Sequence, residues 1–285
     1  MPELPEVETI RRGLAKRILA KTIKGISVAK LRLIKNSLAE FKKELIGNRF
    51  QAIDRVGKLL IFRLTKGHKY MLIHLKMTGQ LIYKDKNELI AGGHNLPLIE
   101  DLPNKYSHII FNFVGGAHLY FNDMRQFGYA QLVNKNSLEK IVAKYGLEPT
   151  SSSFSWLNFK KIFVNKKTKL KAFLLNQQQI AGIGNIYADE ICWQVKILPW
   201  RPIAKIKEAE LKRLYQACRR ILAQAVSQGG TTFSAYRRAD GKKGGYQTYL
   251  QVYGRQGQKC HRCRRLILKN KVAGRGTHYC LFCQK

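Results

Sequence analysis

The sequence predicts an α+β protein of several domains: an N-terminal antiparallel β-sandwich with flanking helices, a helical domain and a C-terminal hairpin with four cysteines. Three observations lead to this fold class. Short apolar runs fill residues 50–135 with no helical segments between them, which favours an antiparallel sandwich over a doubly wound sheet. From about 136 to 227 the apolar residues recur at helical spacing. Near the C-terminus, two Cys-x2-Cys pairs are separated by 16 residues.

These changes of pattern also give the domain boundaries. We expect the sandwich domain over 1–135, the helical domain over 136–230 and the cysteine module over 249–285. Residues 231–248 are rich in Gly, Ser, Thr and basic residues and have little periodicity, so we expect a loop and linker there.

The first residues predict a helix and also contain a reactive group. Pro5 suits the first turn of a helix, and apolar residues follow at helical spacing at Val7, Ile10, Leu14 and Ile18. If Met1 is removed, Pro2 becomes a free secondary amine beside the carboxylate of Glu3. An amine can attack a carbon at the oxidation level of an aldehyde, and an acid can protonate the departing oxygen. Taken alone, an ordinary helix is the better interpretation.

Charge indicates the partner. The chain carries 52 basic and 18 acidic residues, a net charge of +34, while 45% of its residues are hydrophobic. A globular protein with such a field is expected to bind a polyanion, nucleic acid first and an anionic membrane second. The membrane is less favoured because no basic amphipathic helix or lipidation signal gathers the charge. Without an apolar leader or spanning segment, we expect a cytoplasmic, nucleoid-associated protein.

The four paired cysteines predict one structural zinc ion. Cys260, Cys263, Cys280 and Cys283 have the spacing of a four-thiolate zinc site. Such a site is closed and leaves no position open for chemistry. Cys192 and Cys218 stand singly in helical patterns, so we expect them to be buried hydrophobic residues.

The clearest individual elements are a hairpin and a helix. The hairpin pairs 108–113 with 118–122 around Gly115-Gly116, a favourable turn sequence. The helix runs over 208–226 and ends before Gly229-Gly230.

The segment 181–185 has the character of a phosphate-binding turn. Two glycines precede a helix and leave backbone N–H groups open to an anion, Asn185 is a candidate N-cap, and Lys167 brings charge. From the glycines alone a connection without a ligand is about as good an interpretation, and the net charge favours phosphate.

Six short segments in order, together with the cysteine frame, resemble the bacterial formamidopyrimidine-DNA glycosylase family over almost the whole chain. They are residues 1–9, 55–58, 177–190, 229–232, 252–255 and 273–280. The resemblance implies that 136–230 is a helix-two-turn-helix domain and that 231–248 holds the loop that recognises the lesion. It implies a bifunctional DNA glycosylase and abasic-site lyase of base-excision repair, acting on damaged double-stranded DNA as a monomer.

The resemblance also assigns catalytic roles. Pro2 is implied as the nucleophile that forms a Schiff base, and Glu3 as the acid that opens the sugar. Lys58 is implied as a second proton donor in β-elimination, and Arg275 as a residue that assists δ-elimination and holds phosphate. The implied substrates are oxidised purines, namely 8-oxoguanine and formamidopyrimidines.

Six further residues are implied as DNA contacts. Met77, Arg125 and Phe127 resemble the side chains that fill the gap left by an everted base. Lys167 and Asn185 resemble phosphate contacts. Where relatives have two histidines separated by one residue, this chain has Tyr106-Ser107-His108, so Tyr106 takes the position of a DNA-contacting histidine.

Two alternatives remain open from the sequence. One is an endonuclease VIII-like glycosylase of the same fold that prefers oxidised pyrimidines; the start Pro2-Glu3-Leu4-Pro5 and the zinc region favour the purine enzyme. The other is a non-catalytic zinc-containing DNA-binding protein, which leaves Pro2, Glu3, Lys58 and Arg275 unexplained.

Overall fold

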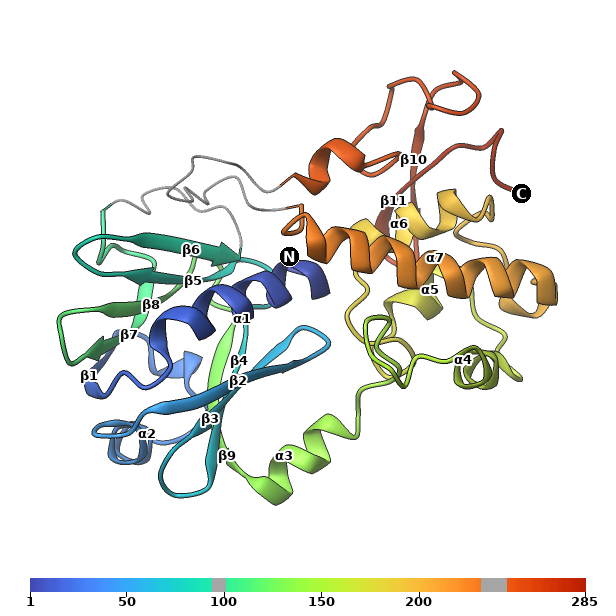
Figure 1. The fold of residues 1–285 in the computed structure, drawn as a ribbon. Helices are drawn as coiled ribbons and strands as arrows, with labels where there is room; N and C mark the ends of the chain where they lie inside the picture. The colour runs from blue at the N-terminus through green and yellow to red at the C-terminus, as the bar shows by residue number, and fades with distance from the viewer. Residues whose placement is uncertain (94–100, 232–244) are drawn as a thin grey trace. The chain divides into compact units, whose positions relative to one another are not determined.

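The chain folds into two units in the computed structural model, which describes residues 1–93, 101–231 and 245–285 (Figure 1). The sandwich unit comprises Met1–Ala143 and Gly229–Gly245. The helical unit comprises Lys144–Gln228 and Tyr246–Lys285. The chain therefore leaves the sandwich unit after Ala143, returns to it for a short segment and leaves it again after Gly245.

The sandwich unit contains two antiparallel sheets, as the sequence predicts. In the five-stranded sheet the order is β1-β7-β8-β5-β6, and in the four-stranded sheet it is β2-β3-β4-β9. The strands are β1 (Ile23–Val28), β2 (Phe50–Val56), β3 (Leu59–Leu64), β4 (Lys69–His74), β5 (Gly79–Lys84), β6 (Leu89–Gly93), β7 (Ser107–Phe113), β8 (His118–Asp123) and β9 (Tyr129–Asn134).

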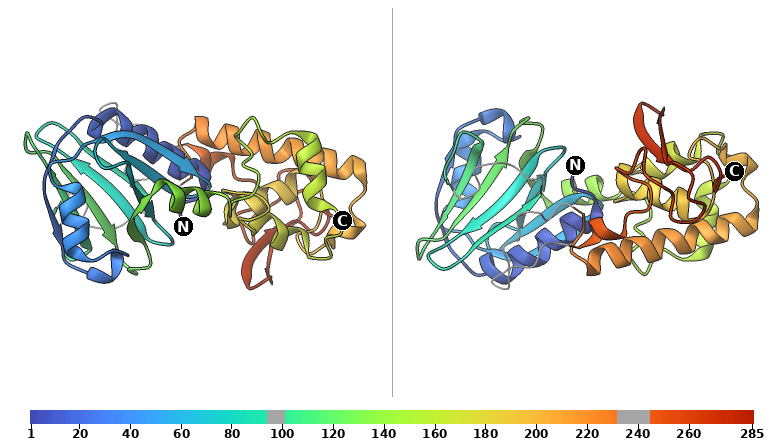
Figure 2. Two further views of the ribbon diagram at one scale, coloured as in Figure 1. Left: turned by 90° about the horizontal axis from the view of Figure 1, so that it is seen from below. Right: turned by 90° about the horizontal axis from the view of Figure 1, so that it is seen from above.

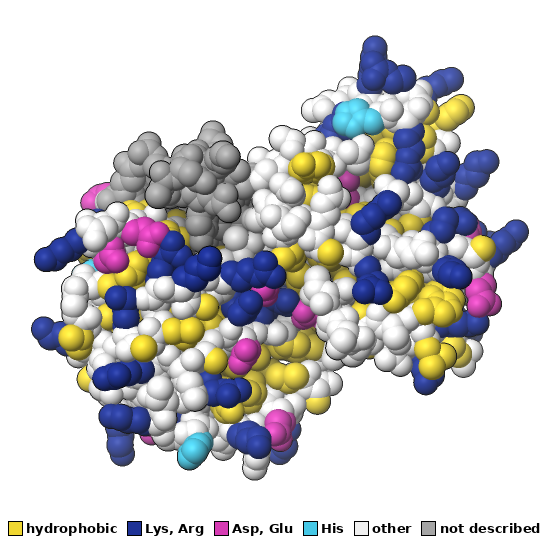
Figure 3. All heavy atoms as spheres, in the orientation of Figure 1, with side chains coloured by type: hydrophobic (Ala, Val, Ile, Leu, Met, Phe, Trp, Pro, Cys, Tyr) yellow, Lys and Arg dark blue, Asp and Glu magenta, His cyan; other side chains and the backbone are white. Residues whose placement is uncertain are grey.

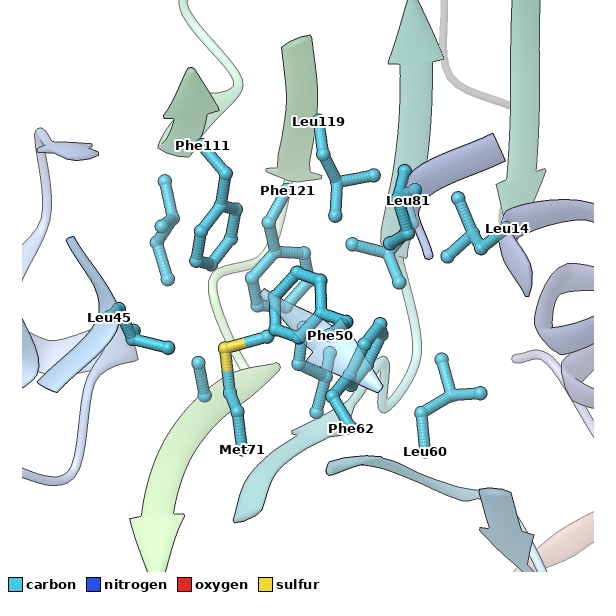
Figure 4. Packing of buried hydrophobic residues seen from close by; sticks show 14 of the residues in the cluster. Leu14, Leu45, Phe50, Leu60, Phe62, Met71, Leu81, Phe111, Leu119 and Phe121 are labelled. Atoms are coloured by element: carbon cyan, nitrogen blue, oxygen red, sulfur yellow. The ribbon is translucent and has the colours of Figure 1, made fainter. Parts of the chain in front are cut away.

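Aromatic side chains from both sheets form the core between them (Figure 4). Phe50 and Phe62 come from the four-stranded sheet and Phe111 and Phe121 from the five-stranded sheet, and all four are fully buried. The rings of Phe50 and Phe62 lie 5.1 Å apart in a tilted arrangement that aromatic pairs prefer.

Helix α1 (Leu4–Ile18) packs on this unit through the predicted apolar stripe. Val7, Ile10, Leu14 and Ile18 are all buried, and the helix contacts β2 and β6 (Figure 2). At Gly92 on β6, a Cβ atom would lie 2.4 Å from Ile10, so only glycine allows this approach. The remaining helices of the unit are η1 (Leu31–Leu33), α2 (Leu38–Leu45) and α3 (Lys135–Val142).

The predicted hairpin is also confirmed. Strands β7 and β8 pair antiparallel, with Phe111 opposite Leu119. Gly115 and Gly116 have φ of 91° and 82°, a conformation that favours glycine.

The helical unit is built around α7 (Glu208–Ser227), which contacts α4 and α6. The apolar face predicted for 208–226 is buried. The other elements are α4 (Trp156–Phe163), α5 (Leu170–Leu175), α6 (Asn185–Gln194), η2 (Ile203–Lys205), η3 (Tyr246–Tyr249), β10 (Leu268–Val272) and β11 (Arg275–Tyr279). Among the described residues, the helices are too short or too polar to cross a membrane.

Candidate active site and zinc module

The amino terminus is fixed by the start of α1. Pro2 is buried and Glu3, the N-cap residue, is 2% exposed. The carboxylate of the buried Glu6 accepts a hydrogen bond from the backbone N–H of Glu3 at 2.9 Å. The predicted nucleophile and acid therefore lie in an ordered turn of the chain.

Lys58 lies beside this terminus. It is 5% exposed in the turn between β2 and β3. Burial lowers the pKa of the Met1 amino group, the carboxylates of Glu3 and Glu6 raise it, and the charge of Lys58 lowers it further. The structure thus brings the terminal amine, Glu3 and Lys58 within electrostatic range of one another, and removal of Met1 transfers the amine to Pro2.

An ion-pair cluster ties the Lys58 turn to α1. The Arg55 side chain donates to Glu8 at 3.1 Å and to the carbonyl of Gly57 at 2.8 Å. Burial alone would raise the pKa of Glu8, but hydrogen bonds from Arg11 and Arg12 and the charge of Arg55 lower it to about 2. Glu8 is therefore a permanent anion that anchors the turn.

His74 lies on the strand beside the Lys58 turn, and the sequence reasoning did not single it out. On β4 its Cα pairs with that of Leu59, the residue after Lys58. Burial, followed by the charges of Lys76 and Lys58, lowers the pKa of His74 to about 3. Its Nδ1 accepts from the Lys76 backbone N–H at 2.9 Å, so the imidazole is neutral and oriented. The available signal was a histidine at the end of an apolar strand, three residues before Met77.

The three predicted gap-filling side chains lie together. Nη1 of Arg125 is 3.2 Å from Sδ of Met77. The Arg125 guanidinium lies 4.7 Å from the centroid of the Phe127 ring. Phe127 is 53% exposed, so it is not part of the core, and an exposed phenylalanine held by an arginine is free to contact a base.

Asp123, also missed from the sequence, shapes the loop that holds two of these residues. It is fully buried at the end of β8. Its carboxylate accepts from the backbone N–H groups of Arg125 at 3.2 Å and Gly128 at 2.7 Å, and from the hydroxyl of Thr78. The loop conformation therefore depends on one carboxylate.

Tyr106 is held near the same residue. Its carbonyl accepts from the Asp123 backbone N–H at 3.1 Å, and its ring is half-buried with the Lys105 ammonium 5.3 Å from the ring centroid. His108 is 2% exposed, and its Nε2 lies 2.8 Å from the Asp123 carbonyl. His108 is therefore a buried partner of Asp123, while Tyr106 has the more accessible side chain.

The Gly229-Gly230-Thr231 segment returns to the sandwich unit and contacts Glu6 of α1. The Glu6 carboxylate accepts from the backbone N–H of Thr231 at 2.7 Å and from its hydroxyl at 3.0 Å. Gly230 has φ of 79°, and a Cβ there would lie 2.6 Å from the Glu6 carboxylate. Thr231 begins the predicted recognition loop of 231–248, and residues 232–244 lie outside the described residues.

In the helical unit, the glycine turn precedes α6 as expected, with one difference. The N-cap residue is Gly184, and Asn185 is the first residue of the helix rather than its cap. Gln177 braces the turn: its amide oxygen accepts from Gly182 N–H at 2.9 Å and its amide nitrogen donates to the Ile183 carbonyl at 2.8 Å. Lys167 is exposed shortly before α5.

Arg275 lies next to this turn, through the strand that it begins. It is the exposed first residue of β11, and the following carbonyl, of Gly276, accepts from Asn185 Nδ2 at 2.9 Å. Two phosphate contacts predicted from distant parts of the sequence are therefore neighbours.

A buried ion pair fixes that arrangement. Lys171 and Asp189 are both fully buried, with Nζ and Oδ1 2.6 Å apart. Lys171 also donates to the Gly276 carbonyl at 3.0 Å and to the Thr277 hydroxyl at 2.8 Å, and Asp189 accepts from His278 N–H at 2.8 Å. The ion pair joins α5, α6 and β11.

The four predicted zinc ligands converge. The sulfur atoms of Cys260, Cys263, Cys280 and Cys283 all lie within 4.8 Å of one another. A tetrahedral site with Zn–S bonds of about 2.3 Å requires sulfurs about 3.8 Å apart, and the Cys260–Cys283 separation is 3.9 Å. The cluster fits one structural zinc ion. Cys192 and Cys218 are buried elsewhere, and burial raises the pKa of both thiols.

Basic side chains dominate the charged surface in the view of Figure 3. Lys and Arg side chains spread over the visible faces of both units, and Asp and Glu are few (Figure 3). The distribution agrees with the net charge of +34.

Comparison with known proteins gives consistent matches along the chain. The model of the formamidopyrimidine-DNA glycosylase N-terminal domain matches residues 1–130, that of the H2TH domain of the same enzyme 145–237, and that of a zinc finger found in FPG and IleRS 257–285.

Full-length relatives and solved structures agree. The formamidopyrimidine-DNA glycosylase of Streptococcus thermophilus is 39% identical to this chain, and the match covers 100% of both proteins. The formamidopyrimidine-DNA glycosylase of Enterococcus faecalis is 40% identical, and the match covers 100% of this chain and 98% of the relative. The structure of Lactococcus lactis Fpg in complex with abasic-site DNA is 35% identical, with a TM-score of 0.88 over 99% of both chains. A complex of a mutant of the same Lactococcus lactis protein with Fapy-dG DNA gives the same TM-score over 100% of both chains. The chain therefore belongs to the formamidopyrimidine-DNA glycosylase family.

Proposed function

We propose that this protein is a bifunctional DNA glycosylase and abasic-site lyase that removes oxidised purines from double-stranded DNA. Membership of the family supports the enzyme class. The observation that carries the proposal for this chain is the grouping of the terminal amine, Glu3 and the buried Lys58. A protein that only binds DNA has no need of a buried lysine beside an amine and a carboxylate.

Pro2 is the proposed nucleophile. An α-amino group has a reference pKa of about 8, so a useful fraction is neutral at physiological pH. After removal of Met1, its nitrogen attacks C1′ of the damaged nucleotide, and the bond from C1′ to the base breaks. The attacking amine loses its proton, and Glu3 protonates the ring oxygen as the sugar opens, which leaves an iminium ion, the Schiff-base intermediate of this secondary amine.

Strand cleavage follows from that iminium. Its positive nitrogen acidifies the C2′ hydrogen, so loss of that proton expels the 3′ phosphate in β-elimination. A further elimination expels the 5′ phosphate. We assign proton donation in the first step to Lys58, and phosphate binding and assistance in the second to Arg275.

Base eversion needs side chains that occupy the vacated stack. The contacts of Arg125 with Met77 and Phe127 support this role for all three. We assign DNA contact to Tyr106 and recognition of the everted base to the loop in 231–248. Reading of the base falls on residues outside those described.

The helical unit supplies the phosphate grip in this proposal. Lys167, Asn185 and Arg275 are the assigned contacts, and the zinc ion has the structural role of holding the hairpin of Arg275. We propose the functional boundaries 1–135, 136–230, 231–248 and 249–285, and a monomer that acts in the cytoplasm at the nucleoid.

Borohydride trapping tests the proposal. With Met1 removed, the protein mixed with an 8-oxoguanine duplex and borohydride should give a covalent adduct, because reduction fixes the Schiff base. Pro2→Gly replaces the secondary amine with a primary one and frees the turn, so it should weaken the adduct, whereas the matched control Pro5→Ala, in the same turn, should retain it. A chain that keeps Met1 should bind DNA without cutting it, because its Pro2 nitrogen is an amide.

The alternatives predict other outcomes. Absence of an adduct with an intact Pro2 terminus would support a non-catalytic DNA-binding protein. Faster trapping on an oxidised-pyrimidine duplex than on 8-oxoguanine would support the endonuclease VIII-like specificity.

A further inference from the structure

The last turn of α6 packs directly on the cysteine cluster. Trp193 is 5% exposed and shares a hydrophobic cluster with Val252, Ile267, Cys260 and Cys280. Two of these neighbours are zinc ligands. An indole from the helical domain thus forms part of the wall around the metal centre.

The indole N–H of Trp193 is a buried donor. Among the described residues its Nε1 has no hydrogen-bond partner. A buried donor without an acceptor costs free energy. Cys260 and Cys280 belong to the same buried cluster as the indole, so a metal-bound thiolate is the acceptor in that cluster that can satisfy this N–H.

Arg262 stacks on the same indole. Its guanidinium carbon lies 3.5 Å from the centroid of the Trp193 ring. Nη1 donates to the Trp193 carbonyl at 2.6 Å and Nη2 to the Gln194 carbonyl at 3.2 Å. A cation at the last carbonyls of a helix is favoured by the helix dipole. Arg262 therefore joins the first cysteine knuckle to the end of α6.

The charge of the zinc centre explains why these partners matter. Four thiolates and one Zn²⁺ carry a net charge of −2, which is costly to bury. Hydrogen-bond donors and a cation beside the sulfurs offset part of that charge, and such outer partners are known to tune metal affinity.

We propose that Trp193 and Arg262 form a second layer around the zinc centre, in which the indole N–H donates to Sγ of Cys260 and the guanidinium covers the indole. The layer retains the metal and ties the C-terminal end of α6 to it. Asp189 and Glu190 tie the middle of the same helix to the adjacent backbone. Contacts with the zinc module thereby help to position Asn185, the first residue of α6. The proposal does not depend on glycosylase activity.

Zinc release tests it. Trp193→Phe keeps most of the packing and removes the N–H. We expect zinc transfer to a chromogenic chelator to become about 10- to 100-fold faster, the range seen when such partners are lost. Trp200→Phe is the matched control, because Trp200 packs edge-on against Tyr279, beside Cys280, with ring centroids 4.7 Å apart. Its release rate should stay within about twofold of the original protein. Equal rates for Trp193→Phe and the original protein, or equal acceleration by both variants, would overturn the proposal.

A spectroscopic readout separates the hydrogen bond from packing. In the cobalt-substituted protein, loss of a donor to a thiolate raises the energy of its lone pairs, so the sulfur-to-cobalt charge-transfer band should move to longer wavelength in Trp193→Phe alone. An unchanged band would contradict the assigned bond. If Trp193→Phe does not fold, Arg262→Gln decides: it should accelerate zinc release, and an unaltered rate would refute the layer.

Discussion

Glu6 accepts two hydrogen bonds from Thr231, a residue 225 positions away, while its other carboxylate oxygen accepts from Glu3 N–H. One buried side chain therefore holds both the start of α1 and the start of the segment that follows Gly230.

Glu6→Gln should loosen both connections, because an amide offers one acceptor oxygen where the carboxylate offers two. We expect a loss of about 1–3 kcal/mol in the free energy of unfolding and slower Schiff-base trapping. Urea unfolding followed by circular dichroism, with single-turnover trapping, measures the two effects. The exposed Glu40→Gln is the control. Unaltered trapping in Glu6→Gln would show that the terminus is held by other contacts.

Phe127→Ala should slow release of a damaged base more than cleavage at a ready-made abasic site, where no base has to be everted. Stacking on an aromatic side chain is worth about 1–3 kcal/mol, which corresponds to about 5- to 160-fold in rate. Single-turnover assays on the two duplexes measure the difference. Phe282→Ala, at another exposed phenylalanine, is the control. Equal slowing on both duplexes would point to a general DNA contact.

His74 should make the sandwich unit sensitive to mild acid. Its pKa is about 3 in the folded chain and 6.5 for the free side chain, so the unfolded chain binds more protons between these values. The contribution of neutral His74 to the free energy of unfolding is fully present above pH 6.5 and is lost as the pH falls toward 3. At pH 5 the loss amounts to about 2 kcal/mol. His74→Gln should flatten this dependence in urea unfolding followed by circular dichroism. The exposed His68→Gln should leave the slope unchanged; the same slope in both variants would rule out His74 as its source.

Lys171→Met should strongly destabilise the helical unit, because it leaves Asp189 charged and buried. Removing one partner of such a pair costs about 3–5 kcal/mol. All three tryptophans, at positions 156, 193 and 200, lie in this unit, so their fluorescence reports its unfolding directly. The exposed pair of Lys160 and Glu208 provides the control, since Lys160→Met should cost at most about 1 kcal/mol. Equal free energies of unfolding for Lys171→Met and Lys160→Met would show that the Lys171–Asp189 pair contributes little to stability.

Removal of zinc should abolish DNA binding while the sandwich unit stays folded. The cysteine module is too small to keep its fold without the metal, whereas the aromatic core of the sandwich is independent of it. Fluorescence anisotropy with a labelled duplex measures binding, and circular dichroism of the β-sheets measures folding. Retained affinity after chelation would separate the metal from DNA binding.

Local patterns predicted most of the fold. The stripe of Val7, Ile10 and Leu14 and the turn at Gly115-Gly116 are visible in the sequence because periodicity and turn chemistry are properties of neighbouring residues. The cysteine spacing predicted the metal site for the same reason. The arrangement of the two sheets rests on contacts between distant segments, which no local pattern records.

The residues that support the site could not be predicted, because their partners come from distant segments. Asp123 is one aspartate at a strand end, and only the fold shows that three donors converge on it. His74 acquires its environment from the neighbouring strand, and Glu6 acquires Thr231 from the far end of the chain. By contrast, Pro2 and Glu3 were proposed from the resemblance of residues 1–9 to the family's amino terminus, because these residues alone favour an ordinary helix.

The path of the chain has a consequence for biosynthesis. Because the sandwich unit is completed by Gly229–Thr231, a nascent chain on the ribosome cannot form the Glu6–Thr231 hydrogen bonds until the whole helical segment has been translated. Emerging sandwich strands can pair earlier, but the amino-terminal turn is secured late. Translation itself thus delays the final ordering of the amino-terminal turn until the helical segment exists.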